Sequence, residues 1–333
     1  MECIAVINQK GGVGKTATTT NLGVALAQRG DRVLLIDMDP QGHLTTHLGL
    51  DAVAKGAGVY ELLTRNLPVK SAIHEVSPLV SVIPSQIDLA AAEVELVSVV
   101  GREVILRDAL ASCSDDFDVA LIDCPPSLGI LTLNSLSVAT RVIIPLQPHF
   151  LALQGVGKLL ETISLVSARI NPRLSVMGML VCMYESGTRL GGEVIKDLET
   201  YLATSRESSV PWRDACIFQT KIRRNVKLAE SPSYGQSIFD YAPKSNGAED
   251  YMSLADEVRP LLGRLKFPVE ETTSSESPEA TPVSDDSPKP RRVRKAPRNP
   301  AEIAAAPQES PPGEQVAGPA ATELPPRPLA ATA

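Results

Sequence analysis

Glycines, a lysine and a threonine near the start of the chain form its best candidate for phosphate binding. Residues 8–16 read NQKGGVGKT. They match the phosphate-loop pattern G-x-x-x-x-G-K-[ST], except that the usual first glycine is absent and Lys10 precedes the glycines. Because glycine has no Cβ, its backbone N–H groups approach phosphate oxygens closely. Lys15 would reach the β- and γ-phosphates and the Thr16 hydroxyl would bind Mg²⁺, which predicts a site for ATP and Mg²⁺.

A glycine-rich turn could match this pattern by chance, but the flanking sequence argues against that interpretation. Residues 4–7 predict a buried strand, and residues 15–29 predict a helix that ends at Gly30. A strand, a glycine loop and a helix in this order place the helix N-terminus at the phosphates. The residues expected to contact the nucleotide are Lys10, Gly11, Gly12, Val13, Gly14, Lys15, Thr16 and Ala17.

Carboxylates end two other apolar segments of strand length. Residues 32–37 end in Asp37, with Asp39 two positions later, and residues 118–123 end in Asp123. In an open parallel sheet, groups at the carboxyl ends of strands lie in the crevice where ligands bind. The run before Asp123 is the Walker B arrangement, so Asp123 would hold Mg²⁺ through its waters. An ordinary turn is the competing interpretation for both segments, because both contain Asp and Pro.

These candidate residues need a scaffold, and the alternation of strand and helix patterns predicts one. Strands are expected at residues 4–7, 32–37, 79–83, 118–123, 141–146 and 175–183. Helices are expected at residues 15–29, 59–65, 154–170 and, as a pair broken by Gly101, within residues 88–112. No second core is indicated between residue 3 and about residue 265. The pattern therefore predicts an α/β domain with a doubly wound, mainly parallel sheet and helices on both faces.

Composition limits the class of protein. The formal charge of −7 gives no global sign of nucleic-acid binding, so any such activity needs a local basic patch. The five cysteines form no metal-ligand spacing, which favours a reducing cytoplasm. No basic leader precedes the first strand, and no apolar run reaches the roughly 18 residues of a membrane span. Neither secretion nor membrane insertion is expected.

The composition changes sharply near residue 267. Residues 268–333 hold 14 of the 27 prolines and no aromatic residue. Such a segment buries too little apolar surface to offset its ordering entropy, so we expect a folded domain at 1–267 and a disordered Pro-rich tail at 268–333. A basic run at residues 289–298 is most simply a solvated element of that tail.

One basic segment lies inside the expected domain. Between residues 212 and 227 a single acidic residue, Asp214, is outnumbered by cations. Runs of this kind usually form a solvated face. In an acidic domain they also offer the local patch that DNA binding requires. The cations are Arg213, Lys221, Arg223, Arg224 and Lys227.

Three motifs together resemble the ParA/MinD group of P-loop ATPases. They are K-G-G-x-G-K-T from Lys10, D-x-D-P-Q-G from Asp37 and D-x-P-P-S-L-G from Asp123. Within that group the chain resembles the chromosomal ParA/Soj family over roughly residues 3–262. The segments that carry this closer resemblance are residues 144–148, 153–156, 225–235 and 247–251. The chain departs from the family pattern at Ala17, where Thr or Ser is commoner. It also departs at residues 187–190, which read GTRL where the family often has RTNL, so that Arg189 stands two positions after the family's arginine.

Several roles are implied by this resemblance alone. Lys10 would reach the phosphates of a second subunit in an ATP-dependent homodimer, Asp39 would orient or activate the attacking water, and Asp37 would support the magnesium site. The family also implies an ATPase that binds double-stranded DNA without sequence preference on the nucleoid. It implies a ParB-like activator protein and the movement of a ParB-bound chromosomal locus. The candidate DNA contacts are Arg189, Lys221, Arg223, Arg224 and Lys227.

Other functions use similar motifs. A MinD-like ATPase acting at a membrane surface needs an amphipathic C-terminal helix, which residues 323–333 cannot form. A protein like the nitrogenase iron protein needs paired cluster cysteines, and the spacing here does not suit them. Operator-specific repression is not expected, because the first strand starts at residue 3 and leaves no room for the N-terminal operator-binding domain of some plasmid ParA proteins. A ParA-like ATPase that positions a non-chromosomal cargo on the nucleoid has the same motifs and remains an open alternative.

Overall fold

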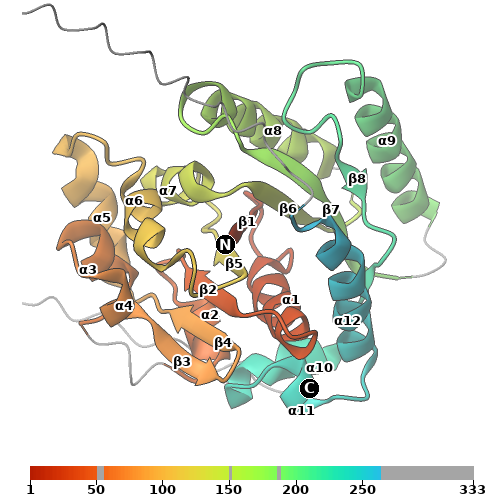
Figure 1. Ribbon diagram of the computed structural model, residues 1–333. Helices are drawn as coiled ribbons and strands as arrows, with labels where there is room; N and C mark the ends of the chain where they lie inside the picture. The colour runs from red at the N-terminus through yellow and green to blue at the C-terminus, as the bar shows by residue number, and fades with distance from the viewer. Residues whose placement is uncertain (51–55, 150–151, 186–188, 264–333) are drawn as a thin grey trace, which may run out of the picture. The chain divides into compact units, whose positions relative to one another are not determined.

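The computed structural model describes residues 1–50, 56–149, 152–185 and 189–263 of the chain. A nine-stranded sheet runs through them in the order β3-β4-β2-β5-β1-β6-β7-β8, and β9 pairs with β7 outside this path (Figure 1). The strands are β1 (Glu2–Val6), β2 (Val33–Asp37), β3 (His74–Ser77), β4 (Val80–Ile83), β5 (Val119–Asp123), β6 (Arg141–Leu146), β7 (Ser175–Tyr184), β8 (Cys216–Ile217) and β9 (Ile222–Arg223).

Helices connect most of these strands. The α-helices are α1 (Lys15–Gln28), α2 (His43–His47), α3 (Val59–Thr64), α4 (Val69–Ala72), α5 (Leu89–Glu95), α6 (Ile105–Leu110), α7 (Ile130–Val138), α8 (Ala152–Arg169), α9 (Arg189–Ser205), α10 (Val226–Glu230), α11 (Ile238–Tyr241) and α12 (Asn246–Val258). Short 3₁₀ turns are η1 (Leu96–Ser98), η2 (Ala111–Cys113), η3 (Ser231–Tyr234) and η4 (Arg259–Leu261).

The sheet is parallel except at one edge. Every strand pair is parallel apart from β3 with β4, which are antiparallel. The order changes direction around β1, which lies between β5 and β6, as in doubly wound folds. The predicted fold class is therefore confirmed, and the carboxyl ends of β1, β2 and β5 lie side by side. The antiparallel strand β3 was not predicted, because residues 43–78 show no clear period.

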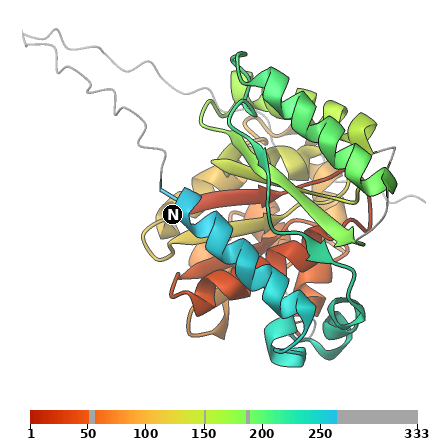
Figure 2. The same cartoon turned by 90° about the vertical axis from the view of Figure 1, so that its right-hand side faces the viewer.

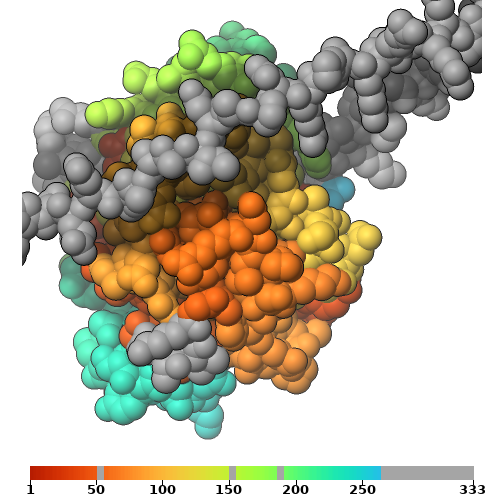
Figure 3. Space-filling model, turned by 90° about the vertical axis from the view of Figure 1, so that its left-hand side faces the viewer, coloured from red at the N-terminus to blue at the C-terminus, as the bar shows by residue number. Residues whose placement is uncertain are grey.

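Both faces of the sheet are covered, which explains why its central strands are continuously apolar. On one face Ile4 and Val6 of β1 pack with Leu22 of α1 and Leu254 of α12. On the other face Ala5 packs in a second apolar cluster, together with residues of α5, α6, α7, α8 and α9. Figure 2 shows α12 lying along the sheet beside α1. On the opposite, left-hand side in Figure 1, α3, α4 and β3 form much of the surface that Figure 3 shows.

A close contact explains one glycine inside α1. A Cβ at Gly23 would lie 2.5 Å from Cδ2 of Leu35 on β2. Glycine thus allows α1 to approach the sheet closely at this point. None of the described helices is long and apolar enough to cross a membrane. The predicted tail, residues 268–333, lies outside the described residues, so its disorder stays a prediction.

Candidate nucleotide-binding site

The glycine loop joins the end of β1 to the start of α1. Gly12 and Gly14 have φ angles of 71° and 97°, in the left-handed region that favours glycine. A Cβ placed at Gly11 or Gly12 would meet no heavy atom within 4 Å. The loop is therefore an open cradle whose backbone a ligand can approach. Gly14 caps α1 without a side chain, so the N-terminal N–H groups of the helix face this cradle.

The two lysines of the loop lie in different surroundings. Lys15 is 7% exposed and lines the cavity next to the glycines. Its Nζ donates to the carbonyl oxygen of Lys10 over 3.4 Å, a long contact that a phosphate could replace. The side chain of Lys10 is exposed, and its backbone N–H donates to Oδ1 of Asn8. Lys15 thus lies inside the cavity, whereas Lys10 is open to solvent.

Asp123 has an oxygen without a partner. Asp123 is the register partner of Asp37 in the parallel pair of β2 and β5. The Thr16 hydroxyl donates to Oδ2 of Asp123 over 2.6 Å, whereas the buried Oδ1 accepts no hydrogen bond from the described residues. Burial, and next the nearby Asp37, raise the pKa of Asp123 well above its usual value. An unpartnered acceptor beside a threonine hydroxyl is what a hydrated Mg²⁺ requires, so these residues fit that ion.

Asp37 has no such free oxygen. Its Oδ2 accepts from the backbone N–H and the hydroxyl of Thr45, at 2.9 and 2.7 Å, and its Oδ1 accepts from the Asp39 N–H at 3.2 Å. Burial raises the pKa of Asp37 to about 6, although these hydrogen bonds oppose the shift. Asp37 therefore holds the loop that follows β2. Asp39, 8% exposed, is positioned by that loop, and its Oδ1 accepts from the Gln41 N–H.

A cavity of about 740 Å³ brings these groups together. Of the predicted nucleotide residues, Gly11, Gly12, Gly14, Lys15, Thr16, Ala17 and the proposed water-orienting residue Asp39 line it. Lys10, Val13, Asp37 and Asp123 are not among its lining residues. The described residues hold no group of three or more His, Cys, Asp or Glu that could bind a metal by themselves. Mg²⁺ needs no such group, because it keeps waters and shares substrate phosphates.

Several lining residues were not predicted. Gln41, Pro125, Pro126 and Ser127 belong to motifs that the sequence analysis identified, so their positions could have been inferred from those motifs. Pro232 lies in residues 225–235, which carry the family resemblance but gave no signal for this site. The remaining residues come from other segments and carried no sequence signal for this site: His43, Thr46, His47, Ala90, Glu93 and Met183. A second cavity, of about 370 Å³, shares Gly14, Ala17 and Met183 with the first and extends toward Ile222 and Tyr251.

The predicted DNA contacts that the structure describes all have partners within the chain. The Lys221 ammonium lies 4.6 Å from the centre of the Tyr184 ring, Arg224 pairs with Glu185, and Lys227 pairs with Glu230 over 2.8 Å. Arg189 is the first residue of α9, and its side chain lies outside what the structure describes.

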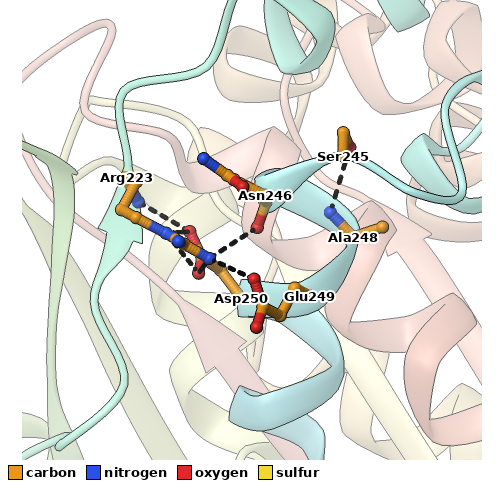
Figure 4. Close-up of polar contacts among 6 residues, drawn as sticks. All are labelled: Arg223, Ser245, Asn246, Ala248, Glu249 and Asp250. Atoms are coloured by element: carbon orange, nitrogen blue, oxygen red, sulfur yellow. Dashed lines mark hydrogen bonds and ion pairs between the residues drawn. The ribbon is translucent and has the colours of Figure 1, made fainter.

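Arg223 has the most extensive contacts of this group. Its guanidinium binds both carboxylate oxygens of Asp250 and also reaches Glu249 and the Asn246 carbonyl, all in the first turns of α12 (Figure 4). The Asp250 side chain is 8% exposed, so this ion pair is half-buried. It raises the pKa of Arg223, chiefly through the hydrogen bonds that the guanidinium donates to Asp250. Arg223 thereby fastens β9 to α12.

Comparison with known proteins agrees with this geometry. A family model described as an AAA domain matches residues 1–176. The sporulation initiation inhibitor protein Soj of Bacillus subtilis is 44% identical over 256 residues, which cover 77% of this chain and 97% of that protein. The chromosome-partitioning ATPase Soj of Treponema pallidum is 43% identical over 257 residues, with 77% and 96% covered.

A solved structure gives the same picture in three dimensions. A protein of Mycobacterium smegmatis titled cobyrinic acid a,c-diamide synthase, with bound ADP and magnesium, is 39% identical, with a TM-score of 0.65. The match covers 78% of this chain and 94% of that one. The phosphate loop, the Walker B strand end and the similarity along the whole domain agree, and the resemblance inferred from the motifs is confirmed. This chain belongs to the AAA-domain family and, within it, to the ParA/Soj chromosome-partitioning ATPases.

Proposed function

We propose that this protein is a chromosome-partitioning ATPase that hydrolyses ATP to ADP and phosphate in the 740 Å³ cavity. The observation that carries the proposal is the unpartnered Oδ1 of Asp123 next to the Thr16 hydroxyl and the open glycine cradle. Relatives of this chain have been solved with ADP, or with an ATP analogue, and magnesium. Mg²⁺ held by Thr16 and Asp123 would neutralise charge on the β- and γ-phosphates.

The residues of this chain would share the remaining work. The N–H groups of Gly11 to Thr16 would cradle the phosphates, and Lys15 would stabilise the charge that develops on them. Asp39 would orient the attacking water from the loop that Asp37 holds. Phosphoryl transfer depends mainly on positioning and charge, so a single carboxylate in this place is sufficient.

Dimerisation would make the activity depend on ATP. The Lys10 side chain is exposed, and in a two-fold dimer each Lys10 would reach the phosphates bound by the other subunit. The dimer would thus be stable with ATP and weak after hydrolysis. It would bind double-stranded DNA without sequence preference, as a nucleoid-associated protein of the cytoplasm, and a ParB-like activator would stimulate hydrolysis and supply the chromosomal cargo.

The cobyrinic acid synthase named for the M. smegmatis relative is a second candidate. Formation of an amide from a carboxylic acid could use the same ATP pocket, so the pocket does not separate the two functions. The decisive experiment measures ATP turnover by the purified chain with either double-stranded DNA and a ParB-like protein, or cobyrinic acid and ammonia. Stimulation by DNA and the ParB-like protein supports partitioning. Formation of amide product, or no turnover under either condition, would overturn it.

A further inference from the structure

The backbone at Met183 is unusual. In the described part of the chain, Asn66 and Met183 are the non-glycine residues with positive φ, both at 52°. Asparagine tolerates this region, whereas a methionine adopts it rarely. The register of β7 with β9 shifts between Cys182 and Tyr184, so Met183 is the extra residue of a β-bulge. Bulges redirect side chains near active sites, and strain of this kind persists where the surroundings impose it.

The bulge places the Met183 side chain between cavities. It lines the 740 Å³ nucleotide cavity, the 370 Å³ cavity beside Ala17 and Asn225, and a 220 Å³ cavity beside His149 and Glu185. No other described residue lines all three. Met183 is half-buried, so this position is not explained by core packing alone.

Met183 is linked to the glycine loop through a single carboxamide. The Nε2 of Gln147, just after β6, contacts the Met183 sulfur and also donates to the carbonyl oxygen of Gly12 over 3.3 Å. The Oε1 of Gln147 lies 2.7 Å from Nε2 of His149, which orients the carboxamide. The side chain of Gln147 is thus held from two sides while it binds the loop.

The direction of the Gly12 carbonyl matters for an anion site. A phosphate cradle needs N–H groups pointing inward and carbonyl oxygens pointing away. Glycine peptides rotate at low cost, and Gly12 has no neighbouring atom where a Cβ would stand. A hydrogen bond that holds the carbonyl outward therefore favours the binding form of the loop.

We propose that Met183 is a positioning residue of the nucleotide site. Its bulged backbone aims the thioether at Gln147, so that the carboxamide keeps the Gly12 carbonyl turned away from the phosphates. This inference rests on the proposed function only in taking ATP as the ligand of the cradle. The competing explanation is that Met183 merely fills space between β7 and the loop, which predicts lost stability but unchanged ATP affinity when the side chain is removed.

The test uses the full chain and three variants: Met183→Gly, Gln147→Ala and the double variant. Glycine adopts a φ of 52° without strain, which offsets part of the stability that is lost with the half-buried side chain, so Met183→Gly should lower the thermal midpoint only modestly and leave the chain folded. We expect the dissociation constant for ATP, titrated with magnesium, to rise on the order of 10-fold for either single variant, because displaced binding groups cost this much or more. The double variant should be no weaker than Gln147→Ala, since both act on one contact.

A matched control is Asn66→Gly, which relieves the same φ far from the site and should not change ATP affinity. Two results would each overturn the inference: wild-type affinity in Met183→Gly, or losses that add in the double variant. A wild-type chain that binds no ATP would instead refute the proposed function. The two failures are therefore distinguishable.

Discussion

The nucleotide site and the basic segment 221–227 both contain several charged side chains, but they differ in whether those side chains have partners within the chain. In the nucleotide site, Asp123 keeps a buried oxygen without a partner and Lys15 has only a long contact with a carbonyl. In the basic segment, Lys221, Arg223, Arg224 and Lys227 all have partners within the chain. Unpartnered buried groups are expensive unless a ligand completes them. The first region therefore has groups that a bound ligand would complete, whereas the described cations of the second are already paired.

This difference changes what DNA binding would require. Exposed ion pairs such as Lys227 with Glu230 are worth little, so a phosphate can displace the glutamate at small cost. The pair between Arg223 and the buried Asp250 is costlier to break, because it leaves a buried carboxylate alone. The DNA roles of all these residues stay predictions. Among them we expect Arg224 and Lys227 to contribute more than Arg223.

The largest effect should come from the lysine of the open site. Lys15→Ala removes the cation that lines the cavity, and we expect ATP affinity to fall by on the order of 10²-fold or more. Lys10→Ala should retain nucleotide binding by the monomer but lose ATP-dependent dimerisation. Equilibrium nucleotide binding and light scattering with ATP separate the two. If Lys10→Ala dimerises as wild type does, Lys10 has no role across the dimer.

Asp39→Ala should give the next effect. Asp39 can handle the water but is not needed to hold the phosphates, so hydrolysis should slow by roughly 10²-fold while the ATP dimer persists. Single-turnover hydrolysis and the lifetime of the dimer are the measurements. Turnover at the wild-type rate, or failure to dimerise with ATP, would show that Asp39 does something else.

The sequence predicts those parts of the two regions whose residues are contiguous, and it does not predict those that depend on contacts between distant residues. The glycine loop, Asp39 and Asp123 were predictable, because each motif is contiguous and its strand precedes it. The sequence did not predict that both carboxylate oxygens of Asp37 accept hydrogen bonds, because two of these bonds come from Thr45, in a short helix that has no periodic signal. The partner of Arg223 was also invisible, because Asp250 lies 27 positions away on a helix whose docking the sequence does not show. The left-handed backbone of Met183 arises from strand pairing and leaves no trace in composition.

Stability should reveal the difference within the basic segment. Arg223→Glu leaves Asp250 without its donor and adds a like charge, so the free energy of unfolding should fall by about 2 kcal/mol. Arg224→Glu breaks an exposed pair and places a like charge beside Glu185, but both side chains are solvated, so a change within about 0.5 kcal/mol is expected. Urea unfolding of both variants measures this. Equal stability would mean that Arg223 is no more committed to the fold than Arg224.

A buried histidine also lines the nucleotide cavity. His47 is 1% exposed, and burial lowers its pKa to about 4. The folded state thus favours the neutral imidazole, and unfolding takes up a proton below pH 6.5. Stability from His47 is complete above pH 6.5 and is lost as the pH falls toward 4. Between pH 7.5 and 5.0 we expect wild type to lose about 2 kcal/mol relative to His47→Gln, because the raised pKa values of Asp37 and Asp123, which act in the opposite direction, contribute to both proteins alike. Parallel pH profiles in urea unfolding would contradict this.

The smallest effect concerns single phosphate contacts. Suppose each subunit offers about three cations to DNA, and each neutralised phosphate contributes roughly −0.9 to the slope of log K against log salt. The slope should then steepen from about −3 without ATP to about −5 with ATP, when two subunits present one face. Lys227→Ala should reduce the slope by about 1 for each subunit in contact, equally on two unrelated duplexes.

The control for that titration is Arg223→Ala, whose guanidinium already binds Asp250 and whose loss should change the slope less. In both variants DNA binding must still switch on with ATP, and ATP-dependent dimerisation must remain intact. Equal slopes with and without ATP would remove the dimer from DNA binding. A larger loss in Arg223→Ala than in Lys227→Ala would show that DNA competes successfully for the Arg223 pair. Binding lost only when residues 268–333 are deleted would move the contact to the basic run at residues 289–298.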